Sequence, residues 1–343
     1  MSIEISYFFL GIISLLILNY LLIKFNFLLE NENKNSHRKI FSTKSQKIQS
    51  GGLFFLIILI TITFQQNIYL TLTLISMFVL GMLSDINLLS SPKIRFFFQI
   101  FLIIFLINFT STFVEQTRII FLDYLIQNLI FSFFFTIFCF LILINGCNFI
   151  DGANNLLIGY FLIVSLCVYY TLNVNDIISV NQTHIKIIII SLTILLIFNF
   201  FSKIIMGDSG AYILGLFFGF TLINFSNDNL DISPIYILNL LWYPAFENLF
   251  SIIRKLKMKI SISKADNFHL HHIIYKYIYS KHKGGSYNNS ISGLVINFFN
   301  LITISTATMV SNHSFYLSLI LIFNIMIYII VYLLLFNKIK FSS

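Results

Sequence analysis

Charged side chains are scarce in this sequence. Asp, Glu, Lys and Arg together make up 10% of its 343 residues, and hydrophobic residues make up 58%. Soluble globular domains contain about 25% charged residues. The composition therefore excludes a soluble domain and predicts a polytopic membrane protein.

Cysteine and the common catalytic signatures are also missing or rare. The three cysteines, Cys139, Cys147 and Cys167, lie in or beside apolar segments without paired spacing, which excludes a disulfide framework and a cysteine metal site. The chain lacks a serine-nucleophile elbow, a Walker loop and a dinucleotide fingerprint. Phosphoryl transfer remains the natural reaction class, because its catalysis consists mostly of positioning and charge neutralisation.

Long apolar runs, each of roughly 15 to 25 residues, predict eleven membrane spans. They are 5–29, 51–65, 68–83, 96–110, 128–144, 156–172, 185–201, 210–225, 235–253, 290–310 and 315–336. The first run is too long for the apolar part of a signal peptide and lacks a basic segment before it. The expected fold is therefore an all-α transmembrane helix bundle that forms a single domain, 1–343.

The basic residues test this count, because cytoplasmic loops are enriched in Lys and Arg. Alternate connections between the spans, taken as one set, hold 18 of the 21 Lys and Arg residues. This set comprises 30–50, 84–95, 145–155, 202–209, 254–289 and the tail after 336. This bias predicts an N-terminus outside and a C-terminus in the cytoplasm. It also explains the net charge of +8 through topology and attraction to anionic lipid, so no nucleic-acid partner is required.

Four carboxylates stand inside polar motifs at the ends of four different spans on this same side. They are Asp85, Asp151, Asp208 and Asp266. Short loops that carry single carboxylates, amides, cations and histidines on one membrane face are what an active site at the cytoplasmic interface requires. We therefore expect the loops 30–50, 84–95, 145–155, 202–209 and 254–289 to form that site.

The segment 145–155 reads NGCNFIDGANN and interrupts an apolar region. A carboxylate such as Asp151 costs about 3 kcal/mol at hydrocarbon depth, and the amides of Asn148 and Asn154 need hydrogen-bond partners when buried. These costs favour a binding role over an ordinary polar loop, which is the alternative.

Two further connections carry glycine, proline and cations. Gly51 and Gly52 allow a backbone to approach a ligand or a neighbouring helix closely. The alternative is a helix start that the glycines make more flexible. Pro92 can open the helix that follows it. Lys93 and Arg95 then lie near the headgroups, where they either anchor the helix or hold a lipid phosphate.

The sequence MGDSG around Asp208 places glycine on both sides of a carboxylate. A tight turn of this kind exposes the carboxylate at a helix N-terminus, which suits Mg²⁺ and its bound phosphates. The alternative is an N-cap with no further role.

Three histidines follow Asp266 in the sequence DNFHLHH: His269, His271 and His272. They suit zinc, and they equally suit a pyrophosphate to which they donate hydrogen bonds beside a metal. Both readings stay open at this point.

Taken together, the motifs Ser84-Asp85 with the following SSPKIR, NGCNFIDGANNL, MGDSG and HLHH resemble the polyprenyl-phosphate N-acetylhexosamine-1-phosphate transferases, relatives of phospho-MurNAc-pentapeptide translocase. The resemblance covers nearly the whole chain. It implies a Mg²⁺-dependent transfer, with Mn²⁺ as an alternative ion, of a sugar 1-phosphate from a UDP-N-acetylhexosamine to undecaprenyl phosphate, with release of UMP. The expected location is the bacterial inner membrane, with the active site on its cytoplasmic face.

The resemblance also implies roles for single residues. Asp208 matches the metal-binding aspartate, and Asp85 the second of a pair of acids that handle the lipid phosphate, which Lys93 and Arg95 attract. Asn148 and Asp151 match the nucleotide motif, and Asn154 falls where a residue reads the uracil. The remaining matches are His269, His271 and His272, which are expected around the pyrophosphate and indicate the branch that starts O-antigen, capsule or related surface glycans.

Three departures from the family pattern are present. Ser84 stands where the first paired acid is expected, which makes a weakened homologue one alternative. Asn155 replaces a glycine, and Asn199 lies one residue too close to Asp208 to receive a uracil role. A lipid or solute transporter is the alternative from another class, although such proteins usually place ionisable groups near the bilayer midplane. The sequence does not specify which sugar is transferred, and it leaves a homodimer open.

Overall fold

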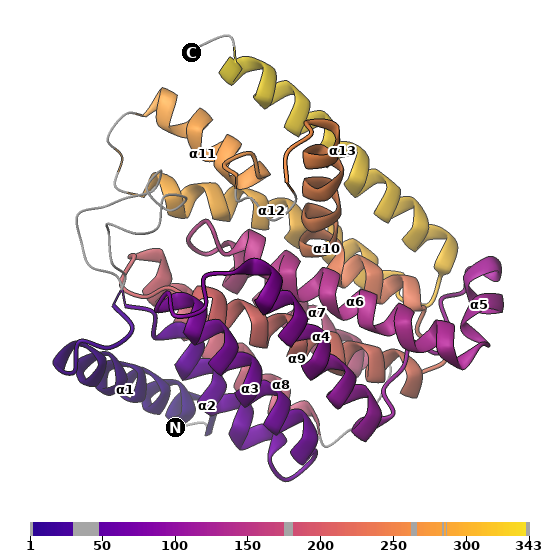
Figure 1. Ribbon diagram of the computed structural model, residues 1–343, viewed down its shortest axis with the longest axis horizontal. Helices are drawn as coiled ribbons and strands as arrows, with labels where there is room; N and C mark the ends of the chain where they lie inside the picture. Colours follow the sequence, from indigo (N-terminus) through magenta and orange to yellow (C-terminus); the bar gives the residue numbers. More distant parts are fainter. Residues whose placement is uncertain are drawn as a thin grey trace.

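The computed structural model describes residues 3–29, 48–174, 181–261, 266–282, 285 and 287–340. Its regular elements in these ranges are all helices, and two isolated β-bridges join Leu29 to Ile48 and Ile48 to Ile204. The helices pack into one bundle with the chain termini at its edges (Figure 1). The basic residues expected in the loop 30–47 lie outside the described residues.

Thirteen helices are described. They are α1 (Ile3–Lys24), α2 (Gly51–Thr63), α3 (Ile68–Asp85), α4 (Pro92–Thr110), α5 (Ile120–Ile126), α6 (Leu129–Ile150), α7 (Leu156–Val174), α8 (Asn181–Phe200), α9 (Gly207–Asp228), α10 (Pro234–Lys257), α11 (Leu270–Lys281), α12 (Asn288–Met309) and α13 (Ser314–Lys340).

Eleven of these helices cover the eleven predicted spans, and α5 and α11 lie in connections. Nine are long and apolar enough to cross a membrane: α1, α3, α4, α6, α7, α8, α9, α12 and α13. The other two are α2, with 13 residues, and α10, whose last turn carries three cations. The all-α, multi-pass prediction is confirmed, whereas the number of spans and their orientation stay predictions.

The helices are longer than the predicted spans at the polar motifs. The run expected to end at 144 continues in α6 to Ile150, so the first half of the polar segment is helical. Likewise α3 includes Asp85, and α9 begins at Gly207. Hydropathy misplaces these boundaries, because a helix continues through Asn and Ser wherever neighbouring helices satisfy their polar groups.

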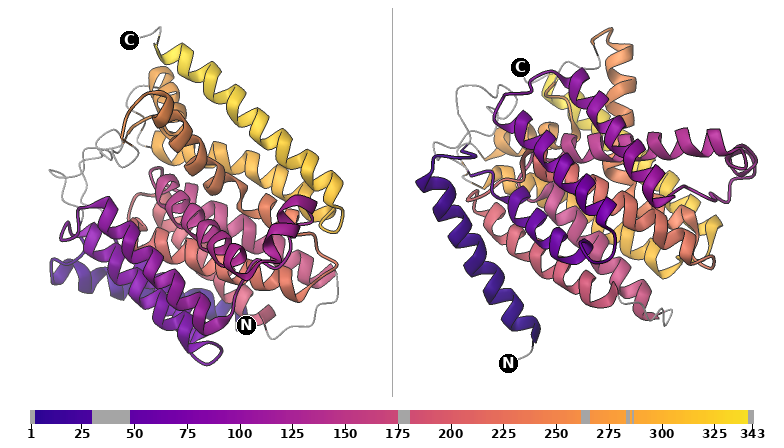
Figure 2. Two further views of the ribbon diagram at one scale, coloured as in Figure 1. Left: turned by 45° about the vertical axis from the view of Figure 1, so that its right-hand side comes forward. Right: turned by 60° about the horizontal axis from the view of Figure 1, so that its bottom comes forward.

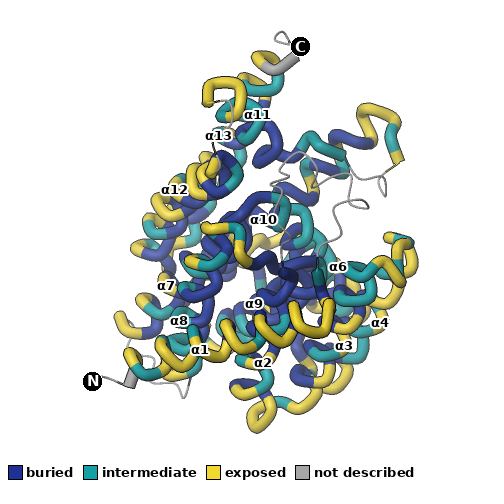
Figure 3. The backbone as a smooth tube through the Cα atoms, turned by 90° about the vertical axis from the view of Figure 1, so that its left-hand side faces the viewer, coloured by how far each residue is buried: buried dark blue, intermediate teal, exposed yellow. Residues whose placement is uncertain are grey.

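Helix α9 lies at the centre of the bundle (Figure 3), and most of its residues are buried. Its glycines allow the neighbours to approach closely. A Cβ on Gly215 would lie 2.8 Å from the Cα of Ile144 on α6, and one on Gly219 would touch Phe140. Small residues at helix contacts are the usual means of close packing in membranes.

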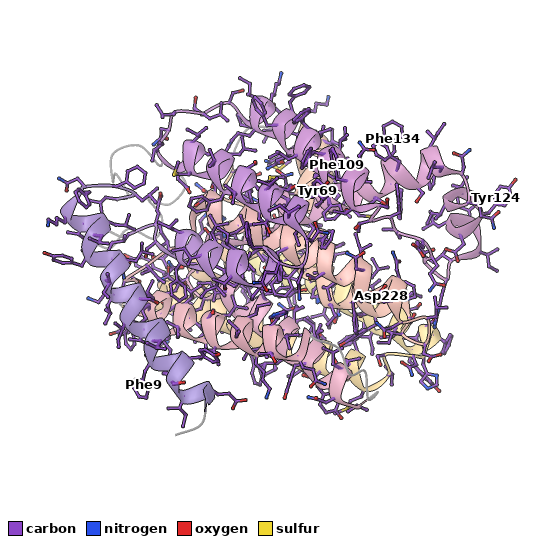
Figure 4. The ribbon with its side chains drawn as sticks, turned by 90° about the horizontal axis from the view of Figure 1, so that it is seen from below. Phe9, Tyr69, Phe109, Tyr124, Phe134 and Asp228 are labelled. Atoms are coloured by element: carbon purple, nitrogen blue, oxygen red, sulfur yellow. The ribbon has the colours of Figure 1, made fainter. Side chains whose placement is uncertain are left out.

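The outer faces carry exposed aromatic and aliphatic side chains. Phe9, Tyr124 and Phe134 project outward, whereas Tyr69 of α3 stacks on Phe109 of α4 with a ring distance of 4.7 Å (Figure 4). Helix α1 lies along the edge of the bundle and packs mainly against α8 (Figure 2). These surfaces agree with contact to lipid.

Helix α10 contains a proline, and two other helices accommodate it. Pro244 has no N–H for the carbonyl of Leu240 one turn earlier, and the Tyr160 hydroxyl of α7 donates to that oxygen instead at 2.8 Å. Gly146 of α6 lies so close to Pro244 that a Cβ would overlap the proline's carbonyl oxygen. This contact fixes α10 against the last part of α6, which leads to Asp151.

The two ends of the bundle differ in the motifs they carry. Helix α9 begins where α3 and α6 end, since it runs antiparallel to both; we call this the site end. At the opposite end, the Arg118 guanidinium binds the carbonyl oxygens of Leu230, Asp231 and Asn312.

Candidate active site

The start of α9 is held by a carboxylate from α3. Gly207 has a φ of +74°, a conformation that favours glycine. Asp85 Oδ1 accepts a hydrogen bond from the backbone N–H of Asp208 at 2.9 Å, and Oδ2 accepts from the N–H and hydroxyl of Ser209 at 3.1 and 2.9 Å. Asp85 thereby supplies the acceptors that the first turn of α9 needs.

Close backbone packing surrounds this turn. A Cβ on Gly81 of α3 would overlap the backbone of Ser209, and one on Gly52 of α2 would lie 2.7 Å from the N of Gly210. Gly52 therefore serves the close approach of a neighbouring helix, α9, whereas a Cβ on Gly51 would meet Ile205 and Met206 just before that helix. The end of α3, the start of α4 and the start of α9 meet at the Asp208 carboxylate.

The Asp208 carboxylate meets one cation and one hydroxyl. Its Oδ2 accepts a hydrogen bond from Ser84 Oγ at 2.6 Å and pairs with Arg95 Nη1 at 2.5 Å. Arg95 also contacts Ser84, and it lies 3.4 Å from the Tyr212 hydroxyl. The side chain of Asp208 remains 20% exposed, so an ion or a phosphate can reach it.

Arg95 and Lys93 therefore take different positions. Pro92 opens α4 as expected, and Arg95 turns inward to Asp208, whereas Lys93 is exposed. The sequence did not indicate the Arg95–Asp208 pair, because its two partners are far apart in the chain.

The second part of the site end is the turn between α6 and α7. Asp151 caps α6, and Asn148 lies half-buried in its last turn. The side chain of Asn154 donates to Ser202 Oγ at 2.7 Å and to Ser290 Oγ at 3.3 Å. The geometry thus gives Asn154 a role in tying the turn to the start of α12 and to the connection after α8.

Asn155 and Asn199 complete this turn. Asn155 has a φ of +65°, a conformation that suits the glycine expected here from the family pattern and that Asn also tolerates. Its backbone N–H donates to Asn199 Oδ1 at 2.5 Å, and Asn199 Nδ2 donates to the carbonyl of Ile204 at 2.7 Å. Asn199 is therefore a structural residue that links α8 to the segment before α9.

The three histidines lie at the start of α11, and all three are buried. His269 stacks parallel to His271 at 5.7 Å, and the rings of His271 and His272 are 4.1 Å apart. A Cβ on Gly152 would overlap the His271 ring. The histidine stack therefore covers the turn that contains Asp151.

Charges and burial around the stack act on its protonation. Burial lowers the pKa of His271 well below its ordinary value, and His272 and His269 lower it further. Asp266 is held by Arg254, whose Nη2 lies 2.8 and 2.9 Å from the two carboxylate oxygens. Burial would raise the pKa of Asp266, but His269, Arg254 and the N–H of Phe268 lower it below the ordinary value.

The two parts of the site lie at the same end of the bundle. Along α6 and α9, Gly219 faces Phe140 and Gly215 faces Ile144 and Cys147. The two helices are thus antiparallel, and this register brings the end of α6, with Asp151, to the level at which α9 begins with Asp208.

The residues at Asp208 fit Mg²⁺ better than zinc. The described residues contain no group of three His, Cys, Asp or Glu side chains that could hold a metal ion. Mg²⁺ needs no such group, because it keeps several waters and binds one or two carboxylates together with substrate phosphates. Asp208 supplies one such carboxylate, and no described residue donates to its Oδ1.

One residue of this region was not assigned to the site from the sequence. Glu247 of α10 is fully buried and bonds to His269. Its position inside an apolar span was the available signal, since carboxylates within membrane helices usually have a function.

Comparisons with known proteins found one family model and one relative. Residues 67–226, which include Asp85, Arg95, Asp151 and Asp208, match the family model described as glycosyl transferase family 4. The chain is also similar to a protein of Bacillus subtilis (strain 168) named probable undecaprenyl-phosphate N-acetylglucosaminyl 1-phosphate transferase. The two are 26% identical over 316 residues, which cover 86% of this chain and 80% of that protein.

Proposed function

We propose that the chain, which matches the model of glycosyl transferase family 4 over residues 67–226, transfers an N-acetylhexosamine 1-phosphate from a UDP-sugar to undecaprenyl phosphate and releases UMP. The relative from Bacillus subtilis bears a name of this type and matches most of the chain. Family and relative together support a sugar-1-phosphate transferase that acts on a polyprenyl phosphate.

The observation that carries the proposal is the contact of three helices at Asp208. Ser84 and Asp85 come from the end of α3, Arg95 from the start of α4, and Asp208 from the start of α9. Two carboxylates and one cation lie together at the site end, and Asp85 occupies the N–H groups at the start of α9. The cation suits a phosphate group, and the Asp208 carboxylate suits a divalent ion that phosphates also bind.

In the proposed reaction a phosphate oxygen of the lipid attacks the β-phosphorus of the UDP-sugar. A new P–O bond forms between the two phosphates, and the bond from the β-phosphorus to the oxygen that bridges it to the α-phosphate breaks. That oxygen leaves with UMP, and the lipid retains a pyrophosphoryl sugar. No oxidant, reductant or covalent enzyme intermediate is needed.

Asp208 is the proposed ligand of Mg²⁺, which would neutralise charge on the phosphates when bound. Mn²⁺ is the alternative ion. Asp85 holds the turn that presents Asp208, and we propose that this positioning is its main contribution. Arg95 supplies a fixed positive charge toward the acceptor phosphate, and the exposed Lys93 attracts the lipid headgroup.

The nucleotide is proposed to bind at the turn between α6 and α7. Asn148 and Asp151 face this region from the end of α6, Asn154 holds the shape of the turn, and the histidine stack covers it. Histidine donors beside the turn suit a pyrophosphate.

The proposed location is the bacterial plasma membrane, with the site end at the cytoplasmic face. The basic bias of the loops on that side supports this orientation. The product would start a surface glycan such as an O-antigen, a capsule or a wall polymer.

The test uses the purified full-length chain with undecaprenyl phosphate, Mg²⁺ and a panel of UDP-N-acetylhexosamines. We expect release of UMP with at least one sugar and a lipid product whose mass equals the acceptor plus the sugar phosphate. A chain that releases no UMP with any sugar but moves a lipid or solute across vesicles would instead be a transporter.

A further inference from the structure

Glu247 is a buried carboxylate on α10 that the proposed reaction does not use. It is 0% exposed. Its Oε1 lies 2.9 Å from Nδ1 of His269, and its Oε2 accepts a hydrogen bond from the Tyr328 hydroxyl of α13 at 2.7 Å. Each carboxylate oxygen therefore has a partner on a different element.

The charge of Glu247 has one counterpart at ion-pair distance, and the Arg254 guanidinium interacts with it electrostatically from further away. Within the ranges that the structure describes, His269 is the sole basic side chain at ion-pair distance from this carboxylate. A buried charge is expensive unless it is paired and hydrogen-bonded. The geometry therefore favours a proton on Nδ1 of His269, donated to Glu247.

The other ring nitrogen of His269 also faces a carboxylate. Nε2 lies 3.8 Å from Oδ1 of Asp266, which Arg254 holds and which Lys255 approaches at 3.9 Å. Since only the imidazolium form carries a hydrogen on both nitrogens, the charged ring is the form that can donate to both acids.

The His269 ring packs near the turn between α6 and α7. The centroids of the His269 and Phe149 rings lie 5.0 Å apart, and Phe149 precedes Asp151 by two residues. His269 also stacks on His271 at an interplanar angle of 9°. His271 in turn lies against Gly152. A rotation of the His269 ring would therefore disturb the stack that covers this turn.

An amide at position 247 would not provide the same control. If the Gln oxygen accepts from Tyr328, its NH₂ donates to Nδ1 of His269 and the ring proton moves to Nε2. If the amide is flipped, Nδ1 keeps its proton but the ring faces no negative charge. The volume and packing would be nearly unchanged. A carboxylate is needed only if the proton on Nδ1, and with it the charge of the ring, matters.

We propose that Glu247 is a positioning residue that keeps His269 protonated on Nδ1 and fixes the histidine stack as a cationic cover for the pyrophosphate of the sugar nucleotide. The assignment of that ligand rests on the proposed function. Carboxylate–histidine pairs that set the tautomer and orientation of a functional ring are a recurring device in protein sites.

The test compares Glu247→Gln with Glu247→Asp and Tyr328→Phe in the full-length protein. The first readout is the ¹⁵N spectrum of histidine-labelled protein without substrate, with His269 assigned through His269→Gln. We expect both His269 nitrogens to be protonated at neutral pH in the parent chain and in Glu247→Asp. In Glu247→Gln we expect a neutral ring.

The second readout is the pH profile of UMP release. Glu247→Gln should lower kcat by about 10- to 100-fold, the usual effect of removing such a supporting residue, and should change the pH profile relative to the parent. Tyr328→Phe keeps the charge, so its smaller loss should not depend on pH. Glu247→Asp should keep the parental pH profile.

The outcomes separate this inference from the proposed function. A neutral His269 in the parent chain, or identical spectra and pH profiles in the parent and Glu247→Gln, would overturn the inference while UMP release stands. A charged ring that depends on Glu247 in a chain that releases no UMP would overturn the proposed function and leave the pairing intact.

Discussion

At the residue scale, Asp208 is neutralised by Arg95 in the described structure. Their atoms lie 2.5 Å apart, and Ser84 donates to the same carboxylate oxygen. A divalent ion must compete with the guanidinium for this carboxylate. One carboxylate with a fixed cation beside it should bind Mg²⁺ weakly until the substrate phosphates contribute further oxygen ligands.

Ser84→Asp should therefore strengthen the binding of Mg²⁺. It adds a second carboxylate beside Asp208, and a favourable change of about 1.4 kcal/mol would lower the half-maximal Mg²⁺ concentration tenfold, well within the interaction of unit charges at short range. The measurement is a Mg²⁺ titration of UMP release.

The matched control for this variant is Ser90→Asp, which adds the same charge at an exposed position of the same connection. A half-maximal concentration that falls equally in both variants, or in neither, would show that Ser84 does not border the metal site.

His271 predicts a pH dependence of stability. Its pKa in the folded chain lies well below 6.5 because of burial, so the unfolded chain takes up a proton first as the pH falls. Stability should decrease below pH 6.5, by up to about 1.4 kcal/mol per pH unit, until the folded ring is protonated as well.

The check is thermal unfolding of the parent and His271→Asn at a series of pH values. As the pH falls from 6.5, the variant should lose less stability than the parent. The comparison stops above the acidic range in which Asp266 is protonated, because the pKa of Asp266 lies below 3.8. Parallel curves for the two proteins would contradict the assignment of a neutral buried ring.

The residues that carry the chemistry were easier to predict than their partners. Asp85 and Asp208 stood out because a carboxylate is rare in an apolar chain. The sequence did not show that Asp85 caps α9 or that Arg95 pairs with Asp208, because these bonds join residues more than a hundred positions apart. Such pairs depend on which helices become neighbours, and hydropathy does not encode that choice.

At the element scale, the site depends on helices that approach more closely than ordinary side chains permit. Gly81 fits against the start of α9, and Gly146 against Pro244 of α10. The contact of Gly146 with Pro244 holds α10, which carries Glu247, against the end of α6. A shift of either helix would move the histidine stack relative to Asp151.

Gly146→Ala should therefore destabilise the protein. The added Cβ would overlap the backbone oxygen of Pro244, and overpacking of this kind typically costs about 1–3 kcal/mol. The measurement is the Tm in detergent. Gly11→Ala on α1 is the control, because its Cβ would meet the flexible end of Ile194 and should change the Tm much less; equal shifts would contradict the account.

The positions of the helices followed from hydropathy, but their ends did not. The segment 145–150 is helical although it is polar, because Asn145 donates to Gln99 Oε1 at 3.0 Å and to the carbonyl of Leu141 at 2.9 Å. The contact with Gln99 joins α6 to α4, and a single sequence does not reveal such a tertiary contact.

At the scale of the whole molecule, the two ends of the bundle have different roles. The motifs meet where α9 begins, whereas the end where α9 stops holds Arg118 and the carbonyl groups that it binds. The convergence of the motifs on one end followed from the alternation of basic and acidic loops. The distances between them required the packing of α9 against α2, α3 and α6.

The most direct measurement compares UMP release by the parent, Asp208→Asn and Asp228→Asn. Both changes remove one carboxylate from α9, but Asp208 lies at the site end and Asp228 is the exposed last residue at the other (Figure 4). We predict that Asp208→Asn abolishes Mg²⁺-dependent UMP release from the UDP-sugar, whereas Asp228→Asn retains it. Full turnover by a folded Asp208→Asn chain would contradict the placement of the reaction at the start of α9.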